Sequence, residues 1–218
     1  MTFTWDWGVI VYAAPSMLRG AWITIQMSVA SMIFGTLIGA VMGVASLSPF
    51  WPIRLLVTSY VYAIRGVPLL VLIFLIYFAL PATGIYLSPT VSGLSALSIY
   101  AGAYITEIFR AGILAVDRGQ TEAAKAIGMT ERMTLTSVLF PQAVRNVIPP
   151  ITNELIKLVK ATSLLSMITV TELTRAAQLV VVEKFTPFEI YLALAFYYLA
   201  IVAALTYLTR YLERKLRA

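Results

Sequence analysis

The sequence predicts an all-α polytopic membrane protein with five transmembrane helices. Hydrophobic residues make up 60% of its 218 residues and charged residues only 12%, a composition too apolar for a soluble domain of this length. Long stretches without a charged residue, each able to cross a bilayer as a helix, alternate with shorter charged segments. The excess charge of each segment predicts its side of the membrane.

Composition also excludes several functions. The chain contains no Cys and no His, so disulfides, thiolate catalysis, imidazole acid–base chemistry and most zinc or haem sites are ruled out. It lacks the phosphate-binding motif G-x-x-x-x-G-K-[ST], so we expect no catalytic residues, no cofactor and no ATP hydrolysis on this chain. The net charge of +6 belongs to loops at the bilayer surface, and we expect no nucleic-acid partner.

Residues 1–19 are predicted to form a periplasmic, interfacial lead-in, and residues 20–218 a transmembrane domain. The lead-in is rich in aromatic side chains and lacks the basic start of a signal peptide. The first spanning helix is expected after residue 20. Its Gly35, Gly39 and Gly43 recur every four residues, which lines one helix face with glycines and lets a neighbouring helix pack closely.

Two more helices are expected in the following apolar stretch. The second should run from about residue 53 to residue 80, with a kink at Pro68, because proline removes a helix hydrogen bond. The third should run from about residue 91 to residue 116, after turn-forming residues at 81–89.

A polar segment, residues 117–141, follows the third helix and is predicted to be cytoplasmic. Asp117 and Gln120 resemble a capping box, so a short helix should run to the breaker Gly128, and Thr130 can cap a second one. Two short helices joined at a glycine present an alanine-rich face that another protein can approach closely. We therefore expect this segment to dock into a partner.

The fourth and fifth helices are expected at residues 142–170 and 190–209, joined by a polar connector at 171–189. Pro149 and Pro150 should distort the start of the fourth helix. The tail after the fifth helix is basic, which predicts a cytoplasmic C-terminus. Five crossings then place the N-terminus in the periplasm.

Glu154, Lys157 and Lys160 are charged residues expected at membrane depth, where ionisable groups are costly. Glu154 and Lys157 could pair along the helix, with Lys160 extending toward the membrane surface. In the alternative interpretation, Glu154 contacts a polar solute near the proline-distorted helix start, where freed backbone groups are available. The residues alone leave both interpretations open.

The polar segment resembles a known family motif. Glu122-Ala123-Ala124, Gly128 and Val138-Leu139-Phe140-Pro141 are spaced as in the EAA loop of bacterial ABC-type import permeases, where the loop fits a groove of the ATP-hydrolysing subunit. The resemblance extends from residue 20 to the basic tail. It implies the transmembrane domain of a type I ABC importer in the bacterial inner membrane, coupled through Glu122, Ala123, Ala124, Ile127, Gly128 and Pro141.

The same resemblance implies partners. A second permease subunit, identical or different, would pair with this chain in the lipid bilayer, separate ATPase subunits would carry ATP and Mg²⁺, and an extracytoplasmic binding protein would deliver solute. Arg65-Gly66-Val67-Pro68-Leu69, and Tyr104 with Glu107, resemble the polar amino-acid branch, which includes histidine, glutamine, arginine and cystine permeases. The implied function is import of a polar amino acid or derivative.

The resemblance also implies a substrate site near the middle of the membrane. Asn153-Glu154 and residues 160–164 align with segments that hold basic amino acids in some relatives. Many relatives carry Asp, Asn and Gln where this chain has Ala161, Tyr100 and Leu72. This difference implies a less polar pocket with a more apolar solute, or a site carried by the partner permease. The implied substrate-binding set is Glu154, Asn153, Tyr100, Leu72, Ala161, Thr162 and Ser163.

Two other classes of membrane protein are alternatives to the importer. An ion-gradient-coupled secondary amino-acid transporter would also place a carboxylate such as Glu154 in a broken helix, but five crossings without an internal repeat argue against it. An intramembrane enzyme would need His or Cys chemistry, or a serine with a base, and the chain has no His or Cys.

Overall fold

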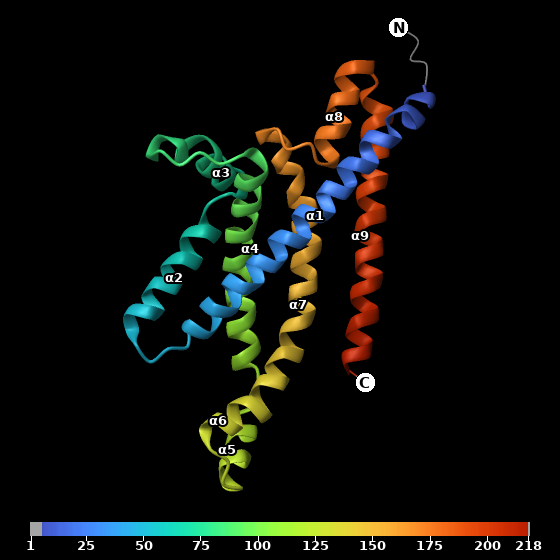
Figure 1. Ribbon diagram of the computed structural model, residues 1–218. Helices are drawn as coiled ribbons and strands as arrows, with labels where there is room; N and C mark the ends of the chain where they lie inside the picture. The colour runs from blue at the N-terminus through green and yellow to red at the C-terminus, as the bar shows by residue number, and fades with distance from the viewer. Residues whose placement is uncertain (1–5, 218) are drawn as a thin grey trace.

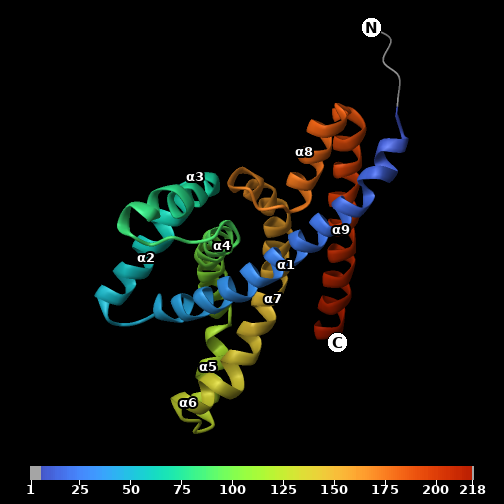
Figure 2. The ribbon, with the colours of Figure 1, turned by 45° about the horizontal axis from the view of Figure 1, so that its top comes forward.

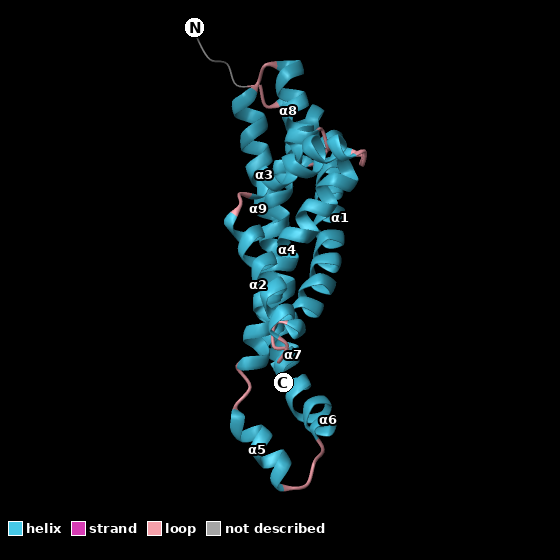
Figure 3. Cartoon of the chain, turned by 90° about the vertical axis from the view of Figure 1, so that its left-hand side faces the viewer, coloured by secondary structure: helices cyan, strands magenta, loops and turns pink. Residues whose placement is uncertain are grey.

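The computed structural model describes the backbone of residues 6–217 and the side chains of residues 6–211. Its elements are helices throughout this range (Figure 3), as the sequence predicted. The α-helices are α1 (Gly8–Ala45), α2 (Trp51–Gly66), α3 (Leu69–Phe74), α4 (Pro89–Leu114), α5 (Arg118–Ala126), α6 (Glu131–Met133), α7 (Phe140–Ala161), α8 (Leu173–Lys184) and α9 (Pro187–Arg217). The π-helical segments Leu75–Ala79 and Thr134–Leu139 and the 3₁₀ segments Leu80–Thr83 and Thr162–Ile168 extend them.

Two of the described helices, α1 and α9, are long and apolar enough to cross a membrane unaided. Three pairs pass the same test only together, because each is bent by more than 40° at a short break: α2 with 69–83, α4 with α5, and 131–168 with α8. Counting each bent pair as one span gives five crossings. This number agrees with the five predicted transmembrane helices.

Helix α1 begins well before the predicted first spanning helix. It runs unbroken from Gly8, so the expected boundary after residue 19 lies inside a helix. Ala13 and Met17 are fully buried and belong to one apolar cluster with Leu173 of α8 and Ile190 of α9. Packing against these two helices keeps this part of the chain helical despite its aromatic and charged residues. The first residues of the expected lead-in, 1–5, lie outside the described chain.

Helix α1 crosses α4 and α7 obliquely (Figures 1 and 2). The predicted glycine face forms its contact with α4. A Cβ atom added at Gly35 would lie 2.7 Å from the Cβ of Ala101, and one added at Gly39 would lie 2.6 Å from the Cβ of Ile105. Both distances are too short for real side chains, so only glycine permits this close approach.

The break at Pro68 is stronger than a kink. Helix α2 ends at Gly66, and Val67 and Pro68 are extended, with ψ of 136° at both residues. The following helical segment is turned by 104°. Proline disfavours a helical conformation of the residue before it, which explains why the helix ends there. The prediction of a bend at this residue is therefore confirmed.

Helix α7 differs from its prediction. Pro149 and Pro150 lie inside α7 and not at its start, and they do not interrupt the helix, although each removes one backbone hydrogen bond. The irregular turns flank α7 instead, as the π-helical segment 134–139 and the 3₁₀ segment 162–168. The expected connector 171–189 contains α8, a helix that packs on α1 and α9.

Candidate solute site and coupling segment

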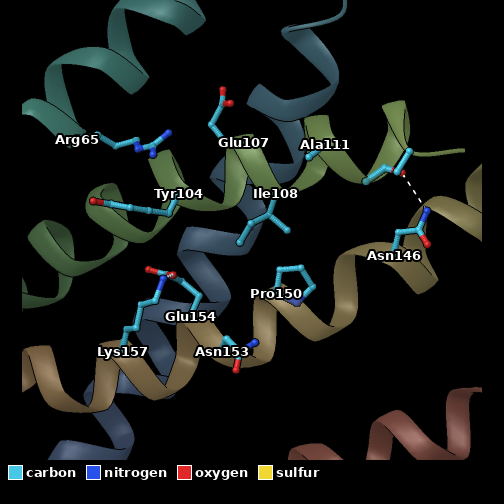
Figure 4. A pocket seen from close by; sticks show the side chains of 12 residues that line it. Arg65, Tyr104, Glu107, Ile108, Ala111, Asn146, Pro150, Asn153, Glu154 and Lys157 are labelled. Atoms are coloured by element: carbon cyan, nitrogen blue, oxygen red, sulfur yellow. Dashed lines mark hydrogen bonds and ion pairs between the residues drawn. The ribbon is translucent and has the colours of Figure 1, made fainter.

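A cavity of about 550 Å³ lies between α4 and α7, with Arg65 of α2 at its edge (Figure 4). The two helices are antiparallel neighbours because the polar segment between them reverses the chain. The cavity combines apolar walls with side chains of both charges. It is lined by Arg65, Tyr104, Glu107, Ile108, Ala111, Gly112, Ala115, Asn146, Pro150, Asn153, Glu154 and Lys157.

Glu154 is the most deeply buried charged residue of the cavity, with 1% of its surface exposed. One carboxylate oxygen, Oε2, accepts from Lys157 Nζ at 2.9 Å. The other, Oε1, is buried and has no hydrogen-bond partner among the described side chains and backbone groups. The predicted pairing with Lys157 therefore exists, but it satisfies only half of the carboxylate. A buried acceptor without a partner is costly and is available to a ligand donor.

Two cations contact the ring of Tyr104. The Arg65 guanidinium carbon lies 5.0 Å from the ring centroid, and Lys157 Nζ lies 5.8 Å from it. In Figure 4 the ring lies between Arg65 and the Glu154–Lys157 pair. Cation–π contact orients both groups beside the cavity. Glu107, one turn further along α4, is 3.6 Å from Nε of Arg110.

The predicted substrate residues are only partly brought together. Asn153 and Glu154 line the cavity. Tyr100 lies one helical turn away, with its ring centroid 4.8 Å from that of Tyr104. Leu72 and Ala161 pack at the edge of an apolar cluster instead of lining the cavity. The hydroxyls of Thr162 and Ser163 donate to the backbone oxygens of Val159 and Lys160, each at 2.7 Å.

Five polar residues of the cavity were not predicted as substrate-binding residues: Arg65, Tyr104, Glu107, Asn146 and Lys157, the last of which was considered only as an ion-pair partner of Glu154. The first three belong to the stretches that resemble the polar amino-acid branch, and that resemblance was the available signal. No sequence signal pointed to Asn146. Its Nδ2 comes within 3.4 Å of the Gly112 backbone oxygen only because α7 packs antiparallel to α4.

The polar segment 117–141, called the coupling segment after its expected role, projects from one end of the bundle as a helix pair (Figures 1 and 3). Asp117 caps α5 by accepting from Gly119 N at 2.7 Å, and Thr130 caps α6 by accepting from Met133 N at 3.3 Å. Gln120 accepts from Gln142 instead of completing a capping box. Gly128 joins the helices with φ of 81°, in the left-handed region that favours glycine.

Most of the predicted coupling residues are exposed on this pair. Glu122, Ala123 and Gly128 are exposed there, and Ile127 has 79% of its surface exposed. Pro141 is exposed too but lies in the first turn of α7. Ala124 is buried and faces inward. An exposed isoleucine beside small side chains forms an apolar contact point at the tip of the molecule.

A bent helical bundle with a charged cavity and a projecting helix pair has the architecture of a membrane transport permease. The chain belongs to the family of binding-protein-dependent transport system inner membrane components, whose model matches residues 35–218. It is therefore an inner-membrane transport subunit. Family membership gives no support to the ion-coupled secondary transporter or to an intramembrane enzyme.

Individual relatives agree with this family. The chain is 41% identical to the L-cystine transport system permease protein TcyB of Bacillus subtilis, over 93% of this chain and 87% of that protein. It is 35% identical to the glutamine transport system permease protein GlnP of Escherichia coli, over 97% and 98% of the two chains.

A solved structure shares the fold closely. A chain in the crystal structure of an amino acid ABC transporter with histidines superposes with a TM-score of 0.93 and 36% identity, covering 98% of this chain and 100% of that one. A chain of the MetNI methionine ABC transporter in an inward facing conformation has a TM-score of 0.77 at 21% identity, over 92% and 96% of the two chains. The second likeness concerns the fold alone. The type I importer fold predicted from the sequence is thus confirmed.

Proposed function

We propose that this chain is the permease subunit of an ATP-driven importer that moves a polar amino acid or amino-acid derivative into the cell. The observation that carries the proposal is the buried Oε1 of Glu154, which has no hydrogen-bond partner in the described part of the chain, at a cavity that Arg65 also lines. A zwitterion matches these opposite charges. The names of the relatives, which specify cystine and glutamine permeases, support the same solute class.

In this proposal Glu154 accepts a hydrogen bond from the solute ammonium group. Asn153 lies beside it at the cavity, and Tyr100 contributes through its contact with Tyr104. Leu72, Ala161, Thr162 and Ser163 form the wider surroundings that tune solute size and polarity. Because they present little polar surface, we infer a solute with a less polar side chain than the basic amino acids.

The proposed partners supply what the chain lacks. Separate ATPase subunits bind ATP and Mg²⁺, a second permease subunit completes the pathway, and an extracytoplasmic binding protein delivers solute. Glu122, Ala123, Ile127, Gly128 and Pro141 form the exposed contact with the ATPase, and the buried Ala124 supports this contact from inside the segment. All but Pro141, which begins α7, lie on the projecting helix pair, a position that suits a segment transmitting motion between subunits (Figure 3).

The coupling role is tested with Gly128→Pro and Glu122→Lys in proteoliposomes that contain the full transporter. Proline cannot adopt the positive φ of Gly128, so the helix pair should lose its geometry. We expect ATP-driven uptake of an amino acid to be lost while the permease remains at its normal level. Thr136→Ala, on the exposed surface of the same segment, is the matched control.

Full uptake and full ATPase association in either Gly128→Pro or Glu122→Lys would contradict the coupling role. Uptake driven by a sodium or proton gradient without ATP would contradict the importer itself.

We further propose a periplasmic N-terminus and a cytoplasmic C-terminus. In Figure 1, α1 begins at the end of the bundle opposite the coupling segment, and α9 runs toward the end that carries it. The basic tail supports the same orientation. A reporter enzyme fused after residue 218 should be active only when the reporter functions in the cytoplasm. Activity of a periplasm-specific reporter at that position would reverse the topology.

A further inference from the structure

A second cavity, of about 740 Å³, adjoins the first between α2 and α4. Both cavities are lined by Arg65, Tyr104 and Glu107, so these three residues form their common border. The second cavity is basic, because Arg54 and Arg110 also line it and Glu107 is the one acid among its lining residues. A carboxylate that leaves the Glu154 cavity past Arg65 therefore enters a region of positive charge.

The three arginines differ in whether their hydrogen-bond donors already have partners within the protein. Arg54 donates through one nitrogen to the backbone oxygens of Ser48 and Pro49, each at 2.8 Å. Arg110 pairs with Glu107. Arg65 is exposed, and no acidic side chain of residues 6–211 lies within ion-pair distance of it. Arg65 therefore keeps its donors available for an anion.

Lys157 is the competing cation at the first cavity, but it is already held by Glu154. Arg65 has the better geometry as well, because a planar guanidinium can donate two parallel hydrogen bonds to one carboxylate. Its contact with the Tyr104 ring holds the guanidinium beside the border of the two cavities.

We propose that Arg65 binds the carboxylate of the solute, and that the arginine-lined cavity receives this carboxylate as the solute leaves Glu154. The inference rests on the proposed amino-acid import function. It assigns the two charged ends of the solute to two different helices, the ammonium to α7 and the carboxylate to α2. A movement of α2 relative to α7 would then change the affinity for the solute.

The test measures direct binding to the purified transporter complex without its binding protein, by calorimetry. The probe is the tightest binder among the standard amino acids and L-cystine, compared with its methyl ester, which lacks the carboxylate charge, and its N-acetyl derivative, which lacks the ammonium. The wild type should prefer the free amino acid over the ester by about tenfold or more, the range of a charge-assisted hydrogen bond.

Arg65→Gln should weaken binding of the free amino acid to the level of its ester and leave ester binding nearly unchanged. Arg65→Lys should recover part of the preference, because it keeps the charge without the planar donor pair. Glu154→Gln should weaken the acid and the ester alike, because both keep the ammonium. Arg19→Gln, an exposed arginine on α1 that lines neither cavity, is the matched control and should bind like the wild type.

Two results would overturn the inference in distinguishable ways. Equal loss of acid and ester binding in Arg65→Gln would give Arg65 a structural or lipid-contacting role. The proposed function would then still be supported by weakened binding in Glu154→Gln. If the wild type bound none of the amino acids, the proposed function would fail, and the role of Arg65 would fail with it.

Discussion

Two buried glutamates of this protein have opposite surroundings. Glu172, at the start of α8, is fully buried, and its carboxylate accepts from Thr174 N at 2.9 Å, Arg175 N at 2.8 Å and the Tyr198 hydroxyl at 3.2 Å. Glu154 of α7 is equally buried but accepts only from Lys157, and its Oε1 has no partner within the described chain. Burial alone therefore does not reveal the role of a carboxylate.

The difference shows two uses of a buried carboxylate, a group whose burial in a membrane helix bundle costs free energy. Glu172 caps α8 and reaches Tyr198 of α9, and the adjacent Leu173 N donates to Thr24 of α1 at 3.2 Å. The Glu172 carboxylate therefore links α8 to α9, and the neighbouring backbone amide of Leu173 links α8 to α1. In Glu154, one carboxylate oxygen pairs with Lys157, and the other remains without a partner in the described chain, at the cavity. A group left incompletely satisfied is suited to a ligand.

The largest effect on stability is expected from Glu172→Ala. The variant loses the helix cap and leaves two part-buried backbone donors, Thr174 N and Arg175 N, without their acceptor, which should cost about 2 kcal/mol of folding stability. Thermal unfolding of the purified protein in detergent measures it. Glu183→Ala, on the exposed surface of the same helix, is the control; it removes only solvent-exposed contacts with Lys184 and Tyr12 and should change stability far less. Similar stability of the two variants would remove the structural role of Glu172.

Glu154→Gln should show the reverse pattern. The amide keeps the size of the side chain and loses only the charged half of one ion pair, so folding stability should change by about 1 kcal/mol or less. Solute binding and solute-stimulated ATP hydrolysis should fall about tenfold or more, because the ammonium loses its charged acceptor. A loss of folded protein with unchanged affinity in the surviving molecules would place Glu154 beside Glu172 as a structural residue.

Much of the bundle was predictable from local signals. Pro68, the glycines at 35, 39 and 43, and the capping residues Asp117 and Thr130 act through their own backbone or helix face, and each acts as expected. Helix α8 was missed because its charges hid an apolar face of Leu173, Ala176, Ala177 and Val180, although their spacing is helical.

The candidate site was less predictable, because it is made of residues distant in the sequence. The cost of burying a charge identified Glu154 from the sequence alone. The contact of Arg65 from α2 with Tyr104 from α4 depends on how the helices pack, and no local pattern encodes it. Conversely, Leu72 was assigned from the resemblance, and Ala161 from the resemblance and its helical spacing from Glu154, and the structure packs both against apolar neighbours.

The smallest effect is expected from Ala161→Asp. This variant tests whether the ion pair with Lys157 reduces the availability of the Glu154 carboxylate to a cationic solute. Residue 161 follows Lys157 by four positions on α7, so a new carboxylate there lies on the same helix face and competes for the lysine. Glu154 would then be more available to cationic solutes. Pairs of this kind contribute about 0.2–0.5 kcal/mol, so the preference for lysine or arginine over glutamine should rise only about twofold.

Binding measurements on the purified complex detect such a change, and Ala161→Asn controls for the size of the new side chain without its charge. Because residue 161 also borders the apolar cluster, the variant should lose some stability. An unchanged solute preference in both Ala161→Asp and Glu154→Gln would instead assign solute specificity to the partner permease.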